Sequence, residues 1–242
     1  MDKAKSGGSK SEGAAGGVAE DQIEDLEGSE LGTKEHWEKA YQNELENYNR
    51  HGIIGDIWFG DDIMMKIVRH IVDETLEVTE QSSICDIGCG NGSLMLEFAR
   101  EGYTKLTGLD YSENALKMAK ALLTGENFTA TFKTFDLLKE YEESEVTAFD
   151  VCLDKGTFDA ISLCPNISAV EGRKRYFNNM LKLLKDNGIF VLASCNWTSK
   201  ELVTFAKDLF DFTGIIPTQE FKFGGKSGSV VSIIILRKKR MF

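Results

Sequence analysis

The sequence predicts one α/β domain built on a doubly wound, mostly parallel seven-stranded sheet with helices on both faces. Three observations lead to this fold class. Apolar runs alternate with segments of helical periodicity, one apolar run opens directly into a glycine-rich turn, and the last two strand-like runs are too close together for a crossover. A chain of 242 residues is long enough to bury a core of this size.

The amino-terminal third differs in composition from the rest of the chain. Residues 1–30 are rich in Gly, Ser and Ala and predict a disordered tail, because few large apolar side chains are present to offset the ordering entropy. We expect residues 31–80 to form a helical cap and residues 81–242 to form the core. A helix capped by Thr33 is predicted from an apolar face with three- and four-residue spacing, made by Trp37, Tyr41, Leu45 and Tyr48.

A glycine-flanked loop at residues 52–60 carries Trp58 and leads into a helix that Asp61 or Asp62 can cap. The core alternation follows. Strands are expected at about 82–87, 105–109, 130–135, 149–154 and 188–194, and helices at about 93–101, 112–123, 171–184 and 199–210. Asn187 and Gly188 would end the third of these helices.

The carboxyl end predicts an antiparallel finish to the sheet. Residues 215–223 and 230–236 both have strand character, and only six residues join them. Because a parallel crossover needs about a dozen residues, these two runs should form an antiparallel hairpin. A dinucleotide-dependent dehydrogenase would instead be expected to continue with parallel crossovers.

The glycine turn predicts a nucleotide site that does not hold a pyrophosphate. Gly88, Gly90 and Gly92 alternate after the first strand, but Ser93 stands where the dinucleotide motif needs a further glycine. Residues 82–99 also contain no Lys or Arg to meet a phosphate. A nucleotide-binding oxidoreductase is therefore disfavoured.

Three carboxylates follow or end successive strands near this turn. Asp86, Asp110 and Asp136 would converge at the carboxyl edge of a parallel sheet, where Asp110 is correctly spaced to bind ribose hydroxyls. Acidic strand ends would repel a pyrophosphate but suit a cofactor with an amino group and a sulfonium. The sequence therefore predicts S-adenosylmethionine as the cofactor, with S-adenosylhomocysteine as its product.

Composition limits the partners. A net charge of -11 and a pI near 4.9 argue against nucleic acid and favour a basic protein partner. No apolar run approaches the roughly 20 residues of a membrane span. The five cysteines and three histidines have no metal-ligand spacing, so no metal is predicted, and reduced thiols point to the cytoplasm, with the nucleus as an alternative. We expect a monomer.

Four motifs resemble those of the seven-β-strand, S-adenosylmethionine-dependent methyltransferases: D-I-G-C-G-N-G at 86–92, Asp110, F-D-L-L at 135–138 and D-K-G-T-F-D at 154–159. Together with residues 31–37 and 56–60, the last motif more specifically resembles the protein-lysine methyltransferases that modify translation elongation factor 1A. This resemblance implies a Rossmann-like class I domain that methylates a lysine side chain of that factor.

The resemblance also implies roles for individual residues. Asp86, Gly88 and Gly90 would hold the methionine part of the cofactor, Asp110 the ribose, and Asp136 with Leu137 the adenine. Trp58 would border the cofactor from the amino-terminal side.

Asp154 is the candidate catalytic residue. Many methyltransferases that act on amides or small molecules carry an Asn/Asp-Pro-Pro-Tyr/Phe motif here, and this chain lacks both prolines, which favours a lysine acceptor. Asp154 would align the amine and accept its proton directly or through water. The structural alternative is a strand-end ion pair with Lys155.

Aromatic side chains could hold a methylated ammonium by cation–π attraction. The candidates for the substrate side are Trp37, Tyr41, Phe158 and Trp197, with Asp159 as a further polar contact. Each aromatic residue could equally pack in the core, and Asp159 could cap a turn. Two further functional alternatives remain open: a small-molecule methyltransferase and a non-catalytic scaffold with this fold.

Overall fold

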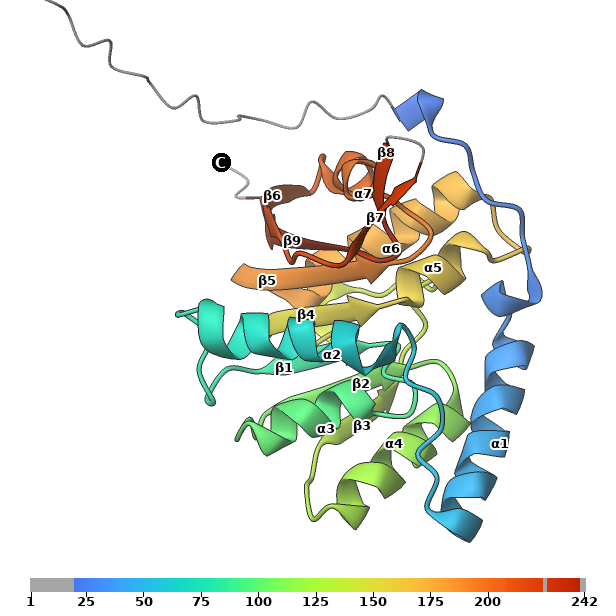
Figure 1. The fold of residues 1–242 in the computed structure, drawn as a ribbon, viewed down its shortest axis with the longest axis vertical. Helices are drawn as coiled ribbons and strands as arrows, with labels where there is room; N and C mark the ends of the chain where they lie inside the picture. The colour runs from blue at the N-terminus through green and yellow to red at the C-terminus, as the bar shows by residue number, and fades with distance from the viewer. Residues whose placement is uncertain (1–19, 224–225, 240–242) are drawn as a thin grey trace, which may run out of the picture.

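A computed structural model describes residues 20–223 and 226–239, and over these residues the chain forms a seven-stranded sheet in the order β3-β2-β1-β4-β5-β9-β6 (Figure 1). The strands are β1 (Ile84–Ile87), β2 (Leu106–Asp110), β3 (Thr131–Thr134), β4 (Phe149–Lys155), β5 (Leu184–Ser194), β6 (Phe210–Ile215) and β9 (Ser232–Lys238). Strands β1 to β5 are parallel, whereas β9 is antiparallel to both β5 and β6. The predicted sheet with an antiparallel end is confirmed.

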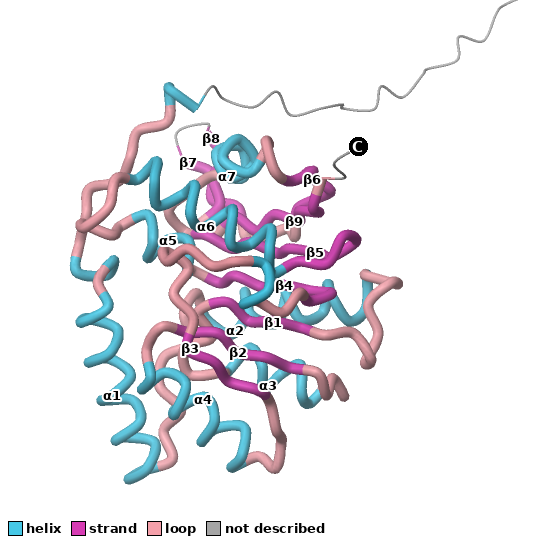
Figure 2. The backbone as a smooth tube through the Cα atoms, turned by 180° about the vertical axis from the view of Figure 1, so that it is seen from behind, coloured by secondary structure: helices cyan, strands magenta, loops and turns pink. Residues whose placement is uncertain are grey.

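Helices cover both faces of this sheet (Figure 2). One face is covered by α2 (Gly60–Arg69), α3 (Ser93–Arg100) and α4 (Glu113–Gly125), and the other by α5 (Thr157–Ser162), α6 (Ala169–Leu183) and α7 (Ser199–Ala206). Neighbouring strand residues face opposite cores, so that Val151 joins the first core and Cys152 the second. None of the helices in the described ranges is long and apolar enough to cross a membrane.

Helix α1 (Lys34–His51) lies outside these two layers and packs beside α4 (Figures 1 and 2). The Thr33 side chain accepts a hydrogen bond from the backbone N–H of His36 at 3.3 Å, which confirms the predicted cap. Helix α2 begins differently from the prediction. Phe59, in the left-handed region at φ 67°, precedes it, and no side chain caps it. Asp61 and Asp62 lie in its first turn, where their negative charges interact favourably with the positive end of the helix dipole.

The carboxyl-terminal strands have other bounds in the structure than those predicted from the sequence. The run at 215–223 is not one strand, because β6 ends at Ile215 and a separate hairpin pairs β7 (Glu220–Phe223) with β8 (Lys226–Ser229). Pro217 interrupts the run, since proline has no N–H for a ladder. The predicted helix to residue 210 stops at Ala206, which frees Phe210 to begin β6. The turn at residues 224–225 lies outside the described residues.

Strand β5 also begins earlier than predicted. Helix α6 ends at Leu183, and Asn187 and Gly188 lie inside the strand as an irregular segment. Phe149 pairs with Leu184 and Val151 with Ile189, so β5 contains extra residues opposite β4. A Cβ at Gly188 would lie 3.1 Å from the Phe149 carbonyl oxygen, which explains glycine at this close approach.

The predicted tail is ordered over part of its length. Residues 1–19 lie outside the described residues, but residues 20–32 run along α5, α6 and α7 and include the short 3₁₀ helices η1 (Glu20–Gln22) and η2 (Glu30–Gly32). Ile23 and Leu26 pack on the second core, and Arg173 binds Asp25 at 2.6 Å. Two apolar side chains and one buried arginine thus contact a segment for which the composition predicts disorder.

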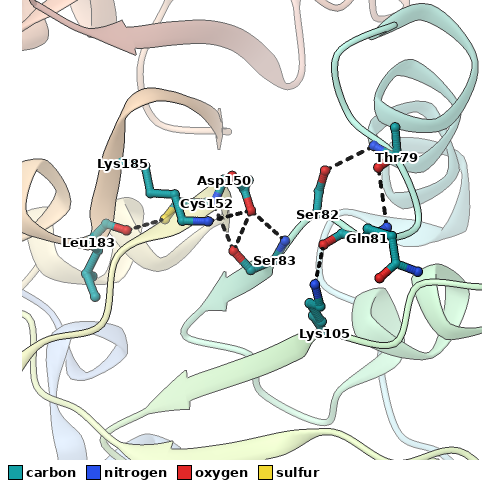
Figure 3. Close-up of polar contacts among 9 residues, drawn as sticks. All are labelled: Thr79, Gln81, Ser82, Ser83, Lys105, Asp150, Cys152, Leu183 and Lys185. Atoms are coloured by element: carbon teal, nitrogen blue, oxygen red, sulfur yellow. Dashed lines mark hydrogen bonds and ion pairs between the residues drawn. The ribbon is translucent and has the colours of Figure 1, made fainter.

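Polar contacts join the amino ends of the strands, as Figure 3 shows. The Asp150 carboxylate accepts hydrogen bonds from the Ser83 N–H at 2.8 Å, the Ser83 hydroxyl at 2.7 Å and Lys185 at 2.8 Å. This network ties β1, β4 and β5 together at the edge opposite the glycine turn. The carboxyl edge is therefore left to form a site.

Candidate active site

Two connected compartments open at the carboxyl edge of the sheet. The larger, of about 210 Å³, lies between the start of α1, the end of β2 and helix α5. The smaller, of about 80 Å³, lies beside the 52–60 loop and is called the aromatic compartment below. Gly88, Asp110, Tyr111, Thr157 and Ala160 line both. The two compartments therefore form one continuous site.

The glycine turn lets other groups approach the backbone closely. Gly88 and Gly90 adopt φ values of 65° and 53°, which side chains rarely tolerate. A Cβ at Gly88 would lie 2.0 Å from the Thr157 hydroxyl oxygen, and one at Gly90 would lie 2.5 Å from the Tyr41 hydroxyl oxygen. Both glycines line the site, so their backbone is available to a ligand.

Asp110 organises the turn from the end of β2. Its carboxylate accepts hydrogen bonds from the Gly90 N–H at 3.0 Å and the Ser112 N–H at 2.8 Å, and it lines both compartments. Burial raises the pKa of Asp110 to about 6. Asp86 lies deeper, at 3% exposure in β1, and lines neither compartment. Burial raises the pKa of Asp86 to about 7, although the nearby charge of Lys155 acts in the opposite direction.

The larger compartment is a mostly apolar slot whose lining includes the carboxylate residues Asp110 and Asp136. Asp136 and Leu137 line it together with Tyr111 and Phe135. The Asp136 carboxylate accepts a hydrogen bond from the Leu138 N–H at 3.0 Å, and Tyr141 stacks on Phe135 with ring centroids 4.2 Å apart. A planar heterocycle with an exocyclic amino group, such as adenine, suits this slot.

Three predicted aromatic residues meet in the aromatic compartment. Trp37 stacks on Tyr41 at 5.9 Å and meets Trp58 edge-on at 5.4 Å, and all three line the compartment. The Trp37 indole N–H donates to the Leu31 carbonyl at 2.7 Å, which fixes its ring. Trp58 is 40% exposed. The compartment can thus enclose an alkyl ammonium between aromatic faces.

Three other predicted substrate residues lie in the interior instead. Phe158 and Trp197 belong to the second core, and the Trp197 indole donates to the Ser162 hydroxyl at 3.1 Å. Asp159 accepts hydrogen bonds from the Cys195 N–H and the Ser194 hydroxyl. None of the three lines either compartment, so the packing alternative describes their surroundings in this structure, and a contact with substrate stays a prediction.

Asp154 is also buried, at 1% exposure. Its carboxylate accepts hydrogen bonds from the backbone N–H groups of Thr157 and Phe158 at 2.8 and 3.0 Å, and from the Tyr176 hydroxyl. It lines neither compartment, so the predicted direct contact with an amine is not present in this geometry. Asp154 instead holds the start of α5 and thereby places Thr157 in the site.

The structure adds residues that the sequence reasoning missed. The Thr157 hydroxyl donates to the Ile87 carbonyl at 2.7 Å and thereby joins α5 to the end of β1. Lys155 donates to the Trp58 carbonyl at 3.1 Å and joins the end of β4 to the 52–60 loop. Burial lowers the pKa of Lys155. Tyr111 and Asn91 also line the site. Sequence could have indicated both, because Tyr111 directly follows the strand-end Asp110 and Asn91 lies within the glycine turn.

The site fits S-adenosylmethionine. The site contains, in this order, glycine backbone free of Cβ atoms, the buried Asp110 carboxylate bonded to the glycine turn, and a mostly apolar slot with Asp136. These features match the methionine, ribose and adenine parts of the cofactor in turn. Within the described residues, no cluster of three His, Cys, Asp or Glu side chains could hold a metal. Fold and site therefore define an S-adenosylmethionine-dependent methyltransferase of the seven-stranded class.

Comparisons with known proteins agree. A methyltransferase domain family model matches residues 79–224. EEF1A lysine methyltransferase 2 of Danio rerio is 39% identical over 89% of this chain and 91% of its own length, and protein-lysine N-methyltransferase EFM4 of Saccharomyces cerevisiae is 34% identical over 89% and 97%. The chain belongs to the EEF1A lysine methyltransferase 2 family.

Solved structures at low identity share the fold. The N-methyltransferase NodS from Bradyrhizobium japonicum, in complex with S-adenosylhomocysteine, has a TM-score of 0.60 at 15% identity and covers 84% of this chain and 99% of its own. The [4+2]-cyclase SpnF has a TM-score of 0.62 at 14% identity, with coverage of 89% and 99%. Because a cyclase and a methyltransferase share this fold, the fold alone does not determine the acceptor.

Proposed function

We propose that this chain transfers methyl groups from S-adenosylmethionine to a lysine side chain of translation elongation factor 1A. The similarity over almost the whole chain to an EEF1A lysine methyltransferase 2 and to a protein-lysine N-methyltransferase carries this proposal. The aromatic compartment beside the glycine turn supports it, because its dimensions and rings suit a lysine ammonium.

Each wall of the site has a part in the reaction. The glycine turn and Asp110 hold the methionine and ribose parts of the cofactor, and the slot with Asp136 and Leu137 holds the adenine. The bound cofactor supplies an electrophilic methyl group on a sulfonium. Trp37, Tyr41 and Trp58 orient the acceptor amine for an in-line approach, and this positioning supplies most of the rate.

The acceptor must lose a proton, because a free lysine has a pKa of about 10.4. Loss of water around the amine inside the compartment disfavours its charged form, and the cationic group of Lys155 on the same wall repels it. Cation–π attraction by the rings acts in the opposite direction and holds the methylated ammonium that forms. Asp56 also lines the compartment and has an exposed side chain. It is therefore placed to pass the proton to solvent.

The test is a transfer assay with radiolabelled S-adenosylmethionine. We expect a cell extract to give one labelled band at elongation factor 1A, and the purified factor to be labelled on lysine. Labelled small molecules without labelled protein would indicate a small-molecule methyltransferase. Cofactor binding without any turnover would indicate a scaffold, and binding of NADH in place of S-adenosylmethionine would indicate an oxidoreductase.

A further inference from the structure

The loop at residues 52–60 displays large apolar side chains to solvent. Ile53 is 57% exposed, Ile54 36% and Trp58 40%. Single exposed apolar residues are common on protein surfaces, but three within six positions of one loop form a local patch. This patch, made by Ile53, Ile54 and Trp58, is called the apolar loop patch below.

The loop is held in place through its backbone. The Asn91 side-chain amide donates to the carbonyls of Ile54 at 3.3 Å and Asp56 at 3.1 Å, and Lys155 donates to the carbonyl of Trp58 at 3.1 Å. Gly55, at φ 89°, packs so closely on Glu44 that a Cβ would lie 2.4 Å from its carboxylate oxygen. Since these contacts use backbone atoms, the loop is ordered while its apolar side chains remain outside.

Preordered apolar side chains favour association, because binding does not have to pay for ordering the loop. The patch is also continuous with the site, since Trp58 is both exposed and part of the aromatic compartment. A molecule seated on the patch would therefore extend directly to the place where the acceptor amine enters.

Charge around the patch selects the partner. Asp56, Asp61 and Asp62 are exposed within or directly after the loop, and the chain carries a net charge of -11. An apolar centre with an acidic rim is complementary to a basic surface that presents an apolar side chain. A second copy of this acidic chain would meet like charge there.

We propose that the apolar loop patch is the docking surface for the folded, basic protein that carries the acceptor lysine, and that it receives an apolar side chain lying beside that lysine. This inference rests on the proposed function and specifies how its site recognises a protein rather than a free amine.

The experiment compares two serine variants, which remove apolar surface without changing charge. Ile53→Ser with Ile54→Ser removes two members of the patch. Leu76→Ser is the matched control, because Leu76 is 91% exposed and lies before β1, at the amino edge of the sheet far from the site. Steady-state methylation of elongation factor 1A, cofactor affinity by calorimetry and thermal unfolding are measured for each.

We expect the double variant to raise the KM for the protein substrate at least tenfold, with cofactor affinity and melting temperature equal to those of the control. A KM equal to that of Leu76→Ser would overturn the docking surface while leaving the proposed function intact. A double variant that changes only the oligomeric state would also overturn it, in favour of a second copy.

Labelling by the wild-type chain tests the proposed function separately from the docking surface. If the wild-type chain labels a different protein, elongation factor 1A is the wrong substrate, and the same KM comparison on the labelled protein decides the docking surface. If the wild-type chain labels no protein at all, both proposals are overturned.

Discussion

Burial sets the charge state of the carboxylates at the strand ends. Removal from water favours the neutral form and raises the pKa of Asp86 to about 7, of Asp110 to about 6 and of Asp154 to about 7. These values lie well above the roughly 3.9 of a carboxyl in an unfolded chain. Stability and cofactor binding should therefore both depend on pH between about pH 4 and pH 7.

The first prediction concerns stability. Because the folded chain binds more protons than the unfolded chain between about pH 4 and pH 7, the free energy of unfolding should fall as pH rises through this window. Urea unfolding without cofactor should show lower stability at pH 7.5 than at pH 5.5. Asp86→Asn should reduce this difference, because it removes one of the carboxyls that ionise in the window. Stability that rises over the same range would contradict the prediction.

The second prediction concerns Asp110. An ionised carboxylate is needed to accept hydrogen bonds from the ribose and from the glycine turn, so cofactor affinity should weaken as pH falls below about 6. Asp110→Asn should weaken binding by about 1 to 3 kcal/mol and flatten the pH profile. Calorimetry with S-adenosylmethionine between pH 5 and 8 measures both effects. Unchanged affinity in the variant would exclude Asp110 from the cofactor site.

The third prediction concerns Asp154. Three donors point at its carboxylate, and an amide can accept from only part of them while its own N–H₂ faces a donor. We expect Asp154→Asn to lower the free energy of unfolding by about 1 to 3 kcal/mol and to slow methyl transfer by displacing Thr157. Tyr176→Phe, which removes a single donor, should have a smaller effect on both. A variant with unchanged stability whose defect eases as pH rises would instead support the proton-accepting role inferred from sequence.

The candidate site could be predicted where local sequence fixes it. Strand-end carboxylates and alternating glycines lie at the carboxyl edge in any parallel sheet, so Gly88, Asp110 and Asp136 could be placed from spacing alone. Phe158 and Trp197 could not, because their burial depends on how α6 and α7 pack over α5, which no local pattern contains.

At the scale of elements, the central strands β1, β4 and β5 were recognisable because strands buried on both faces are continuous apolar runs. The edge strand β6 was not recognisable, because most of its side chains are exposed, so that it has no continuous apolar run, and because Pro217 lies just beyond it. The segment at residues 20–32 was also missed, since a few long-range contacts rather than composition hold it.

The fourth prediction concerns this segment. The Arg173 side chain is 7% exposed, stacks over Phe205 at 4.5 Å and pairs with Asp25. Asp25→Ala would leave a buried guanidinium without its carboxylate, and we expect a loss of about 1 to 3 kcal/mol, less than for a fully buried pair because Asp25 is 46% exposed. Gly32 ends the segment, Thr33 follows it, and both line the larger compartment, so cofactor should also dissociate faster.

Thermal unfolding and stopped-flow dissociation of the cofactor measure these two effects. Glu24→Ala is the control, because Glu24 is an exposed neighbour of the same charge. Equal behaviour of the two variants would mean that the Asp25–Arg173 pair does not anchor the segment.

At the scale of the whole molecule, charge should govern the encounter with substrate. A chain with a net charge of -11 attracts a basic protein over distances up to about the Debye length, which shortens from about 10 Å at 0.1 M salt to about 3 Å at 1 M. We therefore expect kcat/KM for elongation factor 1A to fall at least severalfold as salt rises from 0.05 to about 0.5 M, mainly through association. The contribution of the apolar loop patch should not fall over this range, because salt does not screen apolar contacts. Cofactor affinity measured over the same salt range is the control, since Asp110 and Leu137, which line its site, are buried. If kcat/KM for the protein stays constant, or if short lysine peptides show the same salt dependence as the folded protein, long-range attraction by the acidic surface does not contribute to recognition.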